Sequence, residues 1–356
     1  MLDILCFCVQ LTHRILRHNG AHPLRRRCHV MAYPLSSDPV QACRLPLIDL
    51  TGLLSSNSQQ RNAVAGQIGQ ACREWGFFYI YKHGIDARLQ AAVFEQTRQL
   101  FDLPDEAKRA LDKATSPANR GYEALRGQCL EPGAPADLKE GFYLGRDLPA
   151  DDPRVQAGRF NHGPNQWPAS LPGFRPAMER YHAAMTDLTE RLMAGLALSL
   201  ELPETYFAGF CHQAMATLRL LHYPPQPAMA APGEKGCGAH TDFGGLTLLL
   251  QDENPGLQVW NHHAQDWVDA PPLPGTYVVN LGDMIARWTN DRYRSTLHRV
   301  VNLSGHERYS VPFFFGGNPD HLVSCIPTCL EPGEAPRYPS VTVEAHYREM
   351  YRRTYV

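Results

Sequence analysis

The feature that most constrains the fold is a series of short β-prone segments that begins near residue 215. They read ATLRLLHY, LTLLL, LQVW, WVDA, TYVVNL, STLHRVVN and RYSVPFFF, and turn-forming clusters separate them. Short strands that recur every 8 to 12 residues or so are typical of an antiparallel sandwich or barrel. We therefore expect residues 201–356 to form a jelly-roll core, a double-stranded β-helix.

The N-terminal half has a different pattern. Apolar residues at helical spacing predict helices over 58–74, 86–101 and 176–200, and a further helix is expected at 342–354. Strands are expected at 45–53, at 77–85 and at GFYLG, which lies within the loop-rich stretch 115–177. The fold class is thus α+β and mainly β, with helices flanking the jelly roll. We expect residues 41–200 to join the core in one catalytic unit.

The first 33 residues stand apart in composition. An apolar start, MLDILCFCVQL, is followed by an Arg-rich segment without acidic residues. We expect residues 1–40 to be a disordered extension, or Met31 to be the true start. A mitochondrial presequence is the alternative, because such segments are rich in Arg and poor in acid. The ten cysteines show no zinc-type double pair, which favours reduced thiols in the cytoplasm.

The overall charge excludes two classes of partner. Lys and Arg number 34 and Asp and Glu number 36, so the net charge is −2. Neither nucleic acid nor an anionic membrane surface is expected to bind such a chain by charge. The longest apolar runs, such as LTLLL and VPFFF, are far shorter than the roughly 20 residues that span a bilayer. The patterns carry no signal for an oligomeric state.

A polar His-Thr-Asp sequence stands directly before the apolar run LTLLL. In a strand His240 and Asp242 project from the same face, and His298 in a later β-prone segment offers a third ligand. Two imidazoles and one carboxylate on one face of an octahedron leave three positions open, as in non-haem Fe(II) oxygenases. Zinc sites are usually closed or keep one open position. We therefore expect a catalytic Fe(II) on His240, Asp242 and His298.

A second motif, RYS, follows ten residues after His298. Arg308 and Ser310 share a strand face, and a guanidinium with a neighbouring hydroxyl suits a carboxylate. A basic clamp close to an iron indicates an anionic co-substrate that chelates the metal at its other end. 2-Oxoglutarate has this chemistry.

Together these residues resemble the 2-oxoglutarate/Fe(II)-dependent dioxygenases of the isopenicillin N synthase-like type. The resemblance runs from about residue 45 to 350 and includes LPLIDL, WGFFYIYKHGI, NQWP, HYPP, GDMIARWTND and STLHRV. It implies that Tyr223 also contacts 2-oxoglutarate and that Phe314 packs near the substrate. Plant members often have Asn where this chain has Leu221, which argues against a plant-type substrate.

The resemblance implies Fe(II) and 2-oxoglutarate as cofactor and co-substrate, with O₂ as oxidant. The expected activity is hydroxylation or desaturation of a small organic molecule, with release of succinate and CO₂. We expect the loops of 115–177 to form part of the pocket wall. The substrate candidates there are Tyr122, Arg126, Phe142 and Tyr143.

Three alternatives stay open. An Fe(II) oxidase of the isopenicillin N synthase or aminocyclopropane-carboxylate oxidase kind would use the Arg-Ser pair on its own substrate. Ethylene formation from 2-oxoglutarate is a variant of the main hypothesis. An inactive binding protein is the alternative from another class. Asp283, in NLGDM, is interpreted as a turn residue between two strands.

Overall fold

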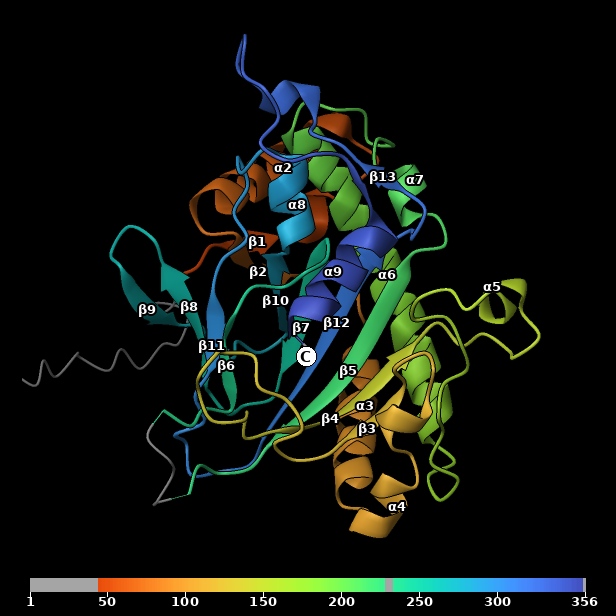
Figure 1. Cartoon of the computed structure of the whole chain (residues 1–356). Coiled ribbons are helices and arrows are strands. Elements are labelled where there is room, and N and C mark those ends of the chain that lie inside the picture. The colour runs from red at the N-terminus through yellow and green to blue at the C-terminus, as the bar shows by residue number, and fades with distance from the viewer. Residues whose placement is uncertain (1–43, 228–232, 355–356) are drawn as a thin grey trace, which may run out of the picture. The chain divides into compact units, whose positions relative to one another are not determined.

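The computed structural model describes residues 44–227 and 233–354 (Figure 1). The predicted extension, residues 1–40, lies outside this part of the chain. Two sheets dominate the described residues. The larger has eight strands in the order β1-β2-β10-β7-β12-β5-β4-β3, and the smaller has four in the order β6-β11-β8-β9. All pairs in the two sheets are antiparallel except β1 with β2.

The strands of the larger sheet come from both halves of the chain. They are β1 (Leu47–Asp49), β2 (Phe77–Tyr81), β3 (Gly121–Glu123), β4 (Glu140–Gly145), β5 (Met215–Tyr223), β7 (Leu246–Gln251), β10 (Thr276–Leu281) and β12 (Arg308–Gly317). The smaller sheet contains β6 (Cys237–His240), β8 (Leu257–Asn261), β9 (Asp266–Asp269) and β11 (His298–Val300). Residues before and after position 200 therefore share one sheet.

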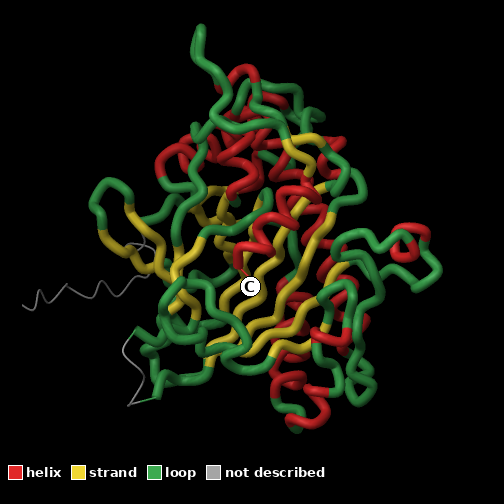
Figure 2. The backbone as a smooth tube through the Cα atoms, viewed as in Figure 1, coloured by secondary structure: helices red, strands yellow, loops and turns green. Residues whose placement is uncertain are grey.

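Three long helices cover one face of the larger sheet (Figure 2). They are α2 (Ser58–Glu74), α3 (Ala87–Phe101) and α6 (Phe174–Ser199), close to the predicted ranges. The Asn57 and Asp86 side chains cap α2 and α3 by accepting hydrogen bonds from the N–H groups of Gln59 and Arg88, both at 2.8 Å. The predicted stripe of α6 is buried: Met178, Tyr181, Met185, Leu188, Leu192 and Leu196.

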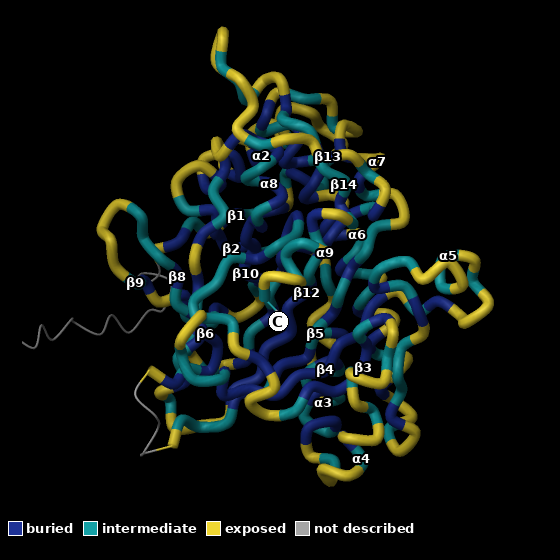
Figure 3. Tube along the Cα trace, in the orientation of Figure 1, coloured by how far each residue is buried: buried dark blue, intermediate teal, exposed yellow. Residues whose placement is uncertain are grey.

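The other face of the larger sheet packs against the smaller sheet. Phe77, Tyr79, Leu221 and Val278 from the larger sheet form a second apolar cluster with residues that include Leu257 and Val259 of β8. Figure 3 shows that most residues of the central strands are buried. The predicted jelly-roll core flanked by helices is confirmed.

The two faces sort the residues of β12 by parity. Tyr309, Val311, Phe313 and Phe315 belong to the helix-side core. The intervening residues, which include Arg308, Ser310 and Phe314, point to the other face because strand side chains alternate. This places the predicted clamp inside the jelly roll.

The remaining elements are short, except for the last helix. They are α4 (Asp105–Arg109), α5 (Pro153–Gln156), α7 (Ala208–Cys211), α8 (Asp283–Trp288), α9 (Val343–Thr354), β13 (Leu322–Val323), β14 (Val341–Thr342) and three 3₁₀ turns at Leu50–Gly52, Lys113–Thr115 and Pro327–Cys329. The strand predicted at 45–53 is too long, because the Asp49 carboxylate accepts the Thr51 N–H at 2.9 Å and turns the chain. None of the helices in the described ranges has the length and apolarity that a membrane crossing requires.

Candidate active site

The three predicted metal ligands meet at the end of the smaller sheet. His240 is the last residue of β6, His298 is the first residue of β11, and the two are register partners. Asp242 follows β6 after one residue. Among the described residues, these three side chains form a group that could hold a metal ion. Each offers one ligand atom, and the three ligand atoms all lie within 4.8 Å of one another. The Nε2 atoms of His240 and His298 lie 3.8 and 3.7 Å from Asp242 Oδ1.

Backbone carbonyls orient both imidazoles. His240 Nδ1 donates to the Gly238 carbonyl at 2.8 Å, and His298 Nδ1 donates to the Thr296 carbonyl at 3.1 Å. A neutral imidazole that donates from Nδ1 keeps Nε2 unprotonated and ready to bind a metal. Burial, together with the neighbouring His240, lowers the pKa of His298 to about 4, so the neutral form prevails near neutral pH.

The Asp242 carboxylate is held from its other oxygen. Oδ2 accepts hydrogen bonds from Thr247 Oγ1 at 2.6 Å and Asn280 Nδ2 at 2.7 Å. Burial alone would raise the pKa of Asp242, but His298, His240 and these two donors outweigh it and lower the pKa below its usual range. Oδ1 of an ionised carboxylate therefore faces the two Nε2 atoms. This donor set of two imidazoles and one carboxylate fits Fe(II) with open positions.

Asp283 has a larger part than a turn between strands. It begins α8, its N–H donates to the Asp242 carbonyl at 2.7 Å, and its carboxylate accepts from Thr241 Oγ1 at 3.1 Å. Burial raises the pKa of Asp283. The interpretation as a turn residue between two strands is thus wrong, because Asp283 is the first residue of a helix that follows β10.

The predicted clamp residues lie together on neighbouring strands. Arg308 pairs in register with Tyr223, and Ser310 pairs with Leu221. The Arg308 guanidinium is fully buried, lies 4.9 Å from the centre of the Tyr223 ring, and donates from Nη2 to Gln251 Oε1 at 2.9 Å. Its Nε and Nη1 atoms are buried and have no hydrogen-bond partner among the described residues. A buried cation with two vacant donors suits a carboxylate.

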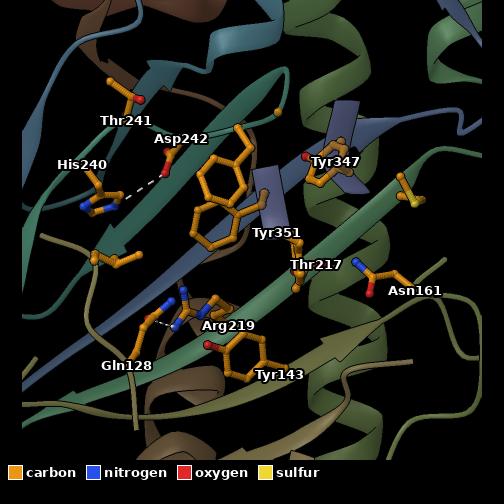
Figure 4. A pocket seen from close by; sticks show the side chains of 16 residues that line it. Gln128, Tyr143, Asn161, Thr217, Arg219, His240, Thr241, Asp242, Tyr347 and Tyr351 are labelled. Atoms are coloured by element: carbon orange, nitrogen blue, oxygen red, sulfur yellow. Dashed lines mark hydrogen bonds and ion pairs between the residues drawn. The ribbon is translucent and has the colours of Figure 1, made fainter. Parts of the chain in front are cut away.

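A pocket of about 720 Å³, including its open mouth, reaches two of the candidate metal ligands, His240 and Asp242 (Figure 4). The strands β4, β5 and β12 contribute Tyr143, Thr217, Arg219 and Phe314 to its wall. The remaining lining residues are Gln128, Leu130, Asn161, Met215, His240, Thr241, Asp242, Phe243, Gly244, Gly316, Tyr347 and Tyr351.

Arg219 gives this wall a positive charge. Its guanidinium lies 4.3 Å from the centre of the Tyr143 ring and 5.9 Å from that of Phe314. Its Nη2 donates to Gln128 Oε1 at 3.3 Å and lies 3.5 Å from Glu123 Oε2. Glu123 also pairs with Lys113 at 2.5 Å, and neither of these two residues lines the pocket.

Two predicted substrate residues do not reach the pocket. Phe142 is fully buried in the helix-side core, where its ring packs edge-on against Phe174 at 5.6 Å. Tyr122 is the register partner of Phe142, and its hydroxyl donates to Glu140 Oε2 at 2.5 Å. Both point away from the pocket, because β4 presents Tyr143 to it and strand faces alternate. Arg126 also lies elsewhere and pairs with Glu234 at 2.8 Å.

Several lining residues escaped prediction. Arg219 and Thr217 share the face of Tyr223 by the period of two, so extending that parity along β5 would have found them. Tyr347 and Tyr351 come from α9, far along the chain, and no local pattern connects them with the pocket. Leu221, at the position of the plant-type Asn, is buried beside Ser310 and offers no polar contact.

Comparisons with known proteins agree with this geometry. Residues 45–170 match the non-haem dioxygenase in morphine synthesis N-terminal family, and residues 214–317 match the 2OG-Fe(II) oxygenase superfamily. The 2-oxoglutarate-Fe(II) type oxidoreductase hxnY of Emericella nidulans is 45% identical over 87% of this chain and 90% of the relative. The 2-oxoglutarate-dependent dioxygenase citB of Monascus ruber is 40% identical over 87% of this chain and 95% of its own length.

Solved structures show the same fold. A full-length Neurospora crassa protein in complex with alpha-KG and thymine superimposes with a TM-score of 0.78 at 31% identity, covering 87% of this chain and 97% of that one. JOX2 in complex with 2OG, Fe and JA gives a TM-score of 0.70 at 29% identity over 90% and 91% of the two chains. The chain therefore belongs to the 2OG-Fe(II) oxygenase superfamily and is a 2-oxoglutarate- and Fe(II)-dependent dioxygenase that acts on a small molecule.

Proposed function

We propose that His240, Asp242 and His298 hold Fe(II) in this enzyme, and that a small organic substrate is hydroxylated or desaturated in the adjoining pocket. The convergence of two Nε2 atoms and one carboxylate oxygen at that pocket carries the proposal. Arg308, Ser310 and Tyr223 are the proposed partners of 2-oxoglutarate, with Arg308 on its distal carboxylate. The vacant Nε and Nη1 of Arg308 support this role.

The chemistry supplied when Fe(II) and 2-oxoglutarate are bound is oxidation of a substrate C–H bond by O₂, with release of succinate and CO₂. The residues of the chain bind the metal, the co-substrate and the substrate and orient them. The two carbonyl acceptors keep the His240 and His298 rings in the metal-binding tautomer. Thr247 and Asn280 occupy one Asp242 oxygen so that the other faces the metal position. The apolar residues of β7 and β12 keep bulk water out of the core.

For the substrate we propose a small molecule with an anionic or hydrogen-bond-accepting group. Arg219 would meet that group, while the Tyr143 and Phe314 rings flank the guanidinium. The Arg219 guanidinium among the pocket-lining residues supports such a partner. Two related structures contain a bound small molecule, thymine in one and JA in the other, which supports a small-molecule substrate here.

The test is succinate release in a screen of small molecules with Fe(II), ascorbate and 2-oxoglutarate. A substrate should stimulate succinate release and O₂ uptake together, and His240→Ala or Asp242→Ala should abolish both. O₂ uptake without succinate would favour an oxidase that needs no co-substrate, and gas analysis would detect ethylene formation. Full turnover in either variant would contradict the iron assignment. Failure of the wild-type protein to bind Fe(II) in anaerobic calorimetry would favour an inactive binding protein.

We also propose a cytoplasmic location. The cysteines among the described residues are free thiols, as expected in a reducing compartment. Cell fractionation of the tagged protein tests this, and recovery in mitochondria would support the presequence alternative.

A further inference from the structure

The strand β6, which carries His240, is irregular in the residues directly before this histidine. β6 lies at the edge of the smaller sheet, beside β11. His298 faces His240 and Val300 faces Cys237, so three steps along β6 oppose two steps along β11. This is a β-bulge, and it leaves Gly238 and Ala239 out of the regular ladder. Bulges beside active sites commonly re-aim a side chain.

Two carboxylates of the 128–139 loop take the N–H groups at this bulge. Asp137 Oδ1 accepts from Gly238 N at 2.8 Å, and Glu131 Oε2 accepts from Ala239 N at 2.9 Å. The loop is closed on itself by Asp137 N donating to the Gln128 carbonyl at 2.8 Å, and Leu138 N donates to the Lys235 carbonyl at 2.8 Å. The loop therefore binds the β6 backbone through side-chain carboxylates, at an edge where a neighbouring strand would bind it through backbone hydrogen bonds.

Two short series of contacts connect Asp137 to the His240 imidazole. In the first route, Gly238 donates its N–H to Asp137, and the carbonyl of the same glycine accepts a hydrogen bond from His240 Nδ1 at 2.8 Å. In the second route, the Lys139 ammonium pairs with Asp137 and lies 3.6 Å from Cys237 Sγ, which lies 3.9 Å from His240 Nδ1.

The ion pair between Asp137 and Lys139 is buried. The side chains of Asp137 and Lys139 are each only 2% exposed. A buried ion pair of this kind is a weak contributor to stability, since desolvation offsets most of its attraction. The loop also passes directly over Gly238, where an added Cβ would lie 2.7 Å from Glu131 Cβ and 2.9 Å from Glu131 N. Only glycine leaves room for this approach.

We propose that Asp137, Glu131 and Lys139 are positioning residues that hold His240 in its metal-binding orientation. None of the three is placed on the metal itself. The proposal rests on the role of His240 as an Fe(II) ligand. Partners that fix a ligating His from behind typically change metal affinity or activity about 10- to 100-fold when they are altered.

The experiment measures Fe(II) binding to the full-length apo protein by calorimetry without oxygen. Asp137→Asn should weaken Fe(II) affinity by about 10- to 100-fold, because the Lys139 ion pair is lost and the grip on Gly238 loosens. Glu131→Ala should weaken it in the same direction. At saturating Fe(II), the KM for 2-oxoglutarate should stay at the wild-type value in both variants, since the clamp residues are untouched.

Asp147→Asn is the matched control. Asp147 also accepts a backbone N–H, from Asn165 at 2.7 Å, but it holds a loop that does not include β6. This variant should keep wild-type Fe(II) affinity even if its melting temperature falls. A similar fall in melting temperature across the three variants would then separate loss of stability from loss of metal affinity.

Wild-type Fe(II) affinity in both Asp137→Asn and Glu131→Ala would overturn the proposal. If Asp137→Asn does not fold, Glu131→Ala decides alone, because its side chain is 34% exposed and its removal is compatible with folding. Failure of the proposed function gives a different result: wild-type protein that does not bind Fe(II), or His240→Ala that binds it as tightly as wild type.

Discussion

At the residue scale, Arg308 carries the largest expected single effect outside the metal ligands. Its buried guanidinium has two vacant nitrogen donors, and a hydrogen bond between charged groups contributes about 1.5–3 kcal/mol. Arg308→Ala should therefore raise the KM for 2-oxoglutarate by about 10- to 100-fold. Arg308→Lys should recover little, because a lysine keeps the charge but lacks the planar fork.

Succinate release against 2-oxoglutarate concentration measures this effect. Arg175→Ala is the control, since Arg175 pairs on the surface with Glu179 and its side chain is 55% exposed. An unchanged KM in Arg308→Ala would remove the clamp role.

His222 gives a pH prediction for stability. Its Nδ1 lies 2.7 Å from Glu140 Oε1, its Nε2 pairs with Glu307, and its ring stacks on Tyr309 at 4.8 Å. Burial alone would lower the pKa of His222, but the two carboxylates outweigh it and raise the pKa above its ordinary value. The charged ring therefore stabilises the folded state. This contribution is complete below the unfolded-state pKa of about 6.5 and is lost as pH rises through the higher folded-state pKa.

Urea unfolding at a series of pH values checks the sign. The unfolding free energy of wild type relative to His222→Gln should fall as pH rises across that window. The control is His212→Gln at an exposed position. A difference that grows with pH would contradict the assigned direction.

At the scale of the element, β4 separates packing from recognition within two adjacent residues. Phe142 faces the helices and Tyr143 faces the pocket. Tyr143→Leu should raise the KM for the substrate and remove the ring beneath Arg219. Phe142→Leu should leave that KM unchanged and lower the unfolding free energy, by less than the roughly 3–5 kcal/mol expected for Phe→Ala in a core.

Steady-state kinetics and chemical unfolding of the two variants measure both effects. Both variants introduce leucine at adjacent positions on opposite faces of β4, so each variant is the control for the other. A change in substrate KM for Phe142→Leu alone would mean that the pocket lies on the helix side of β4.

At the scale of the whole molecule, ligand binding should be visible as stability. A ligand that binds only the folded state at about 100 times its Kd adds about 2.7 kcal/mol. Fe(II) together with 2-oxoglutarate should therefore raise the anaerobic melting temperature, and a chelator should reverse the rise. Asp242→Ala should show no rise, because the ligand set is incomplete. An equal rise in that variant would place the metal elsewhere.

The chemistry of the site could be predicted from the sequence because it depends on local spacing. One residue separates His240 from Asp242, and one residue separates Arg308 from Ser310. Strand alternation places Arg308 and Ser310 on one face of β12, whereas Asp242 lies beyond the end of β6. The helices α2, α3 and α6 were predictable for the same reason, since helical periodicity is local. The strand ends were less predictable, as β1 and β11 show.

Only the tertiary structure decided how distant segments share the pocket. The period of two in β4 leaves open which face meets the helices, and packing against Phe174 turned Phe142 inward and Tyr143 toward the pocket. Tyr347 and Tyr351 reach the pocket from α9, and the 128–139 loop reaches β6, through contacts that no local pattern encodes. Periodicity and residue chemistry along one segment determine which groups can act together; the packing of separate segments against one another determines which of them meet.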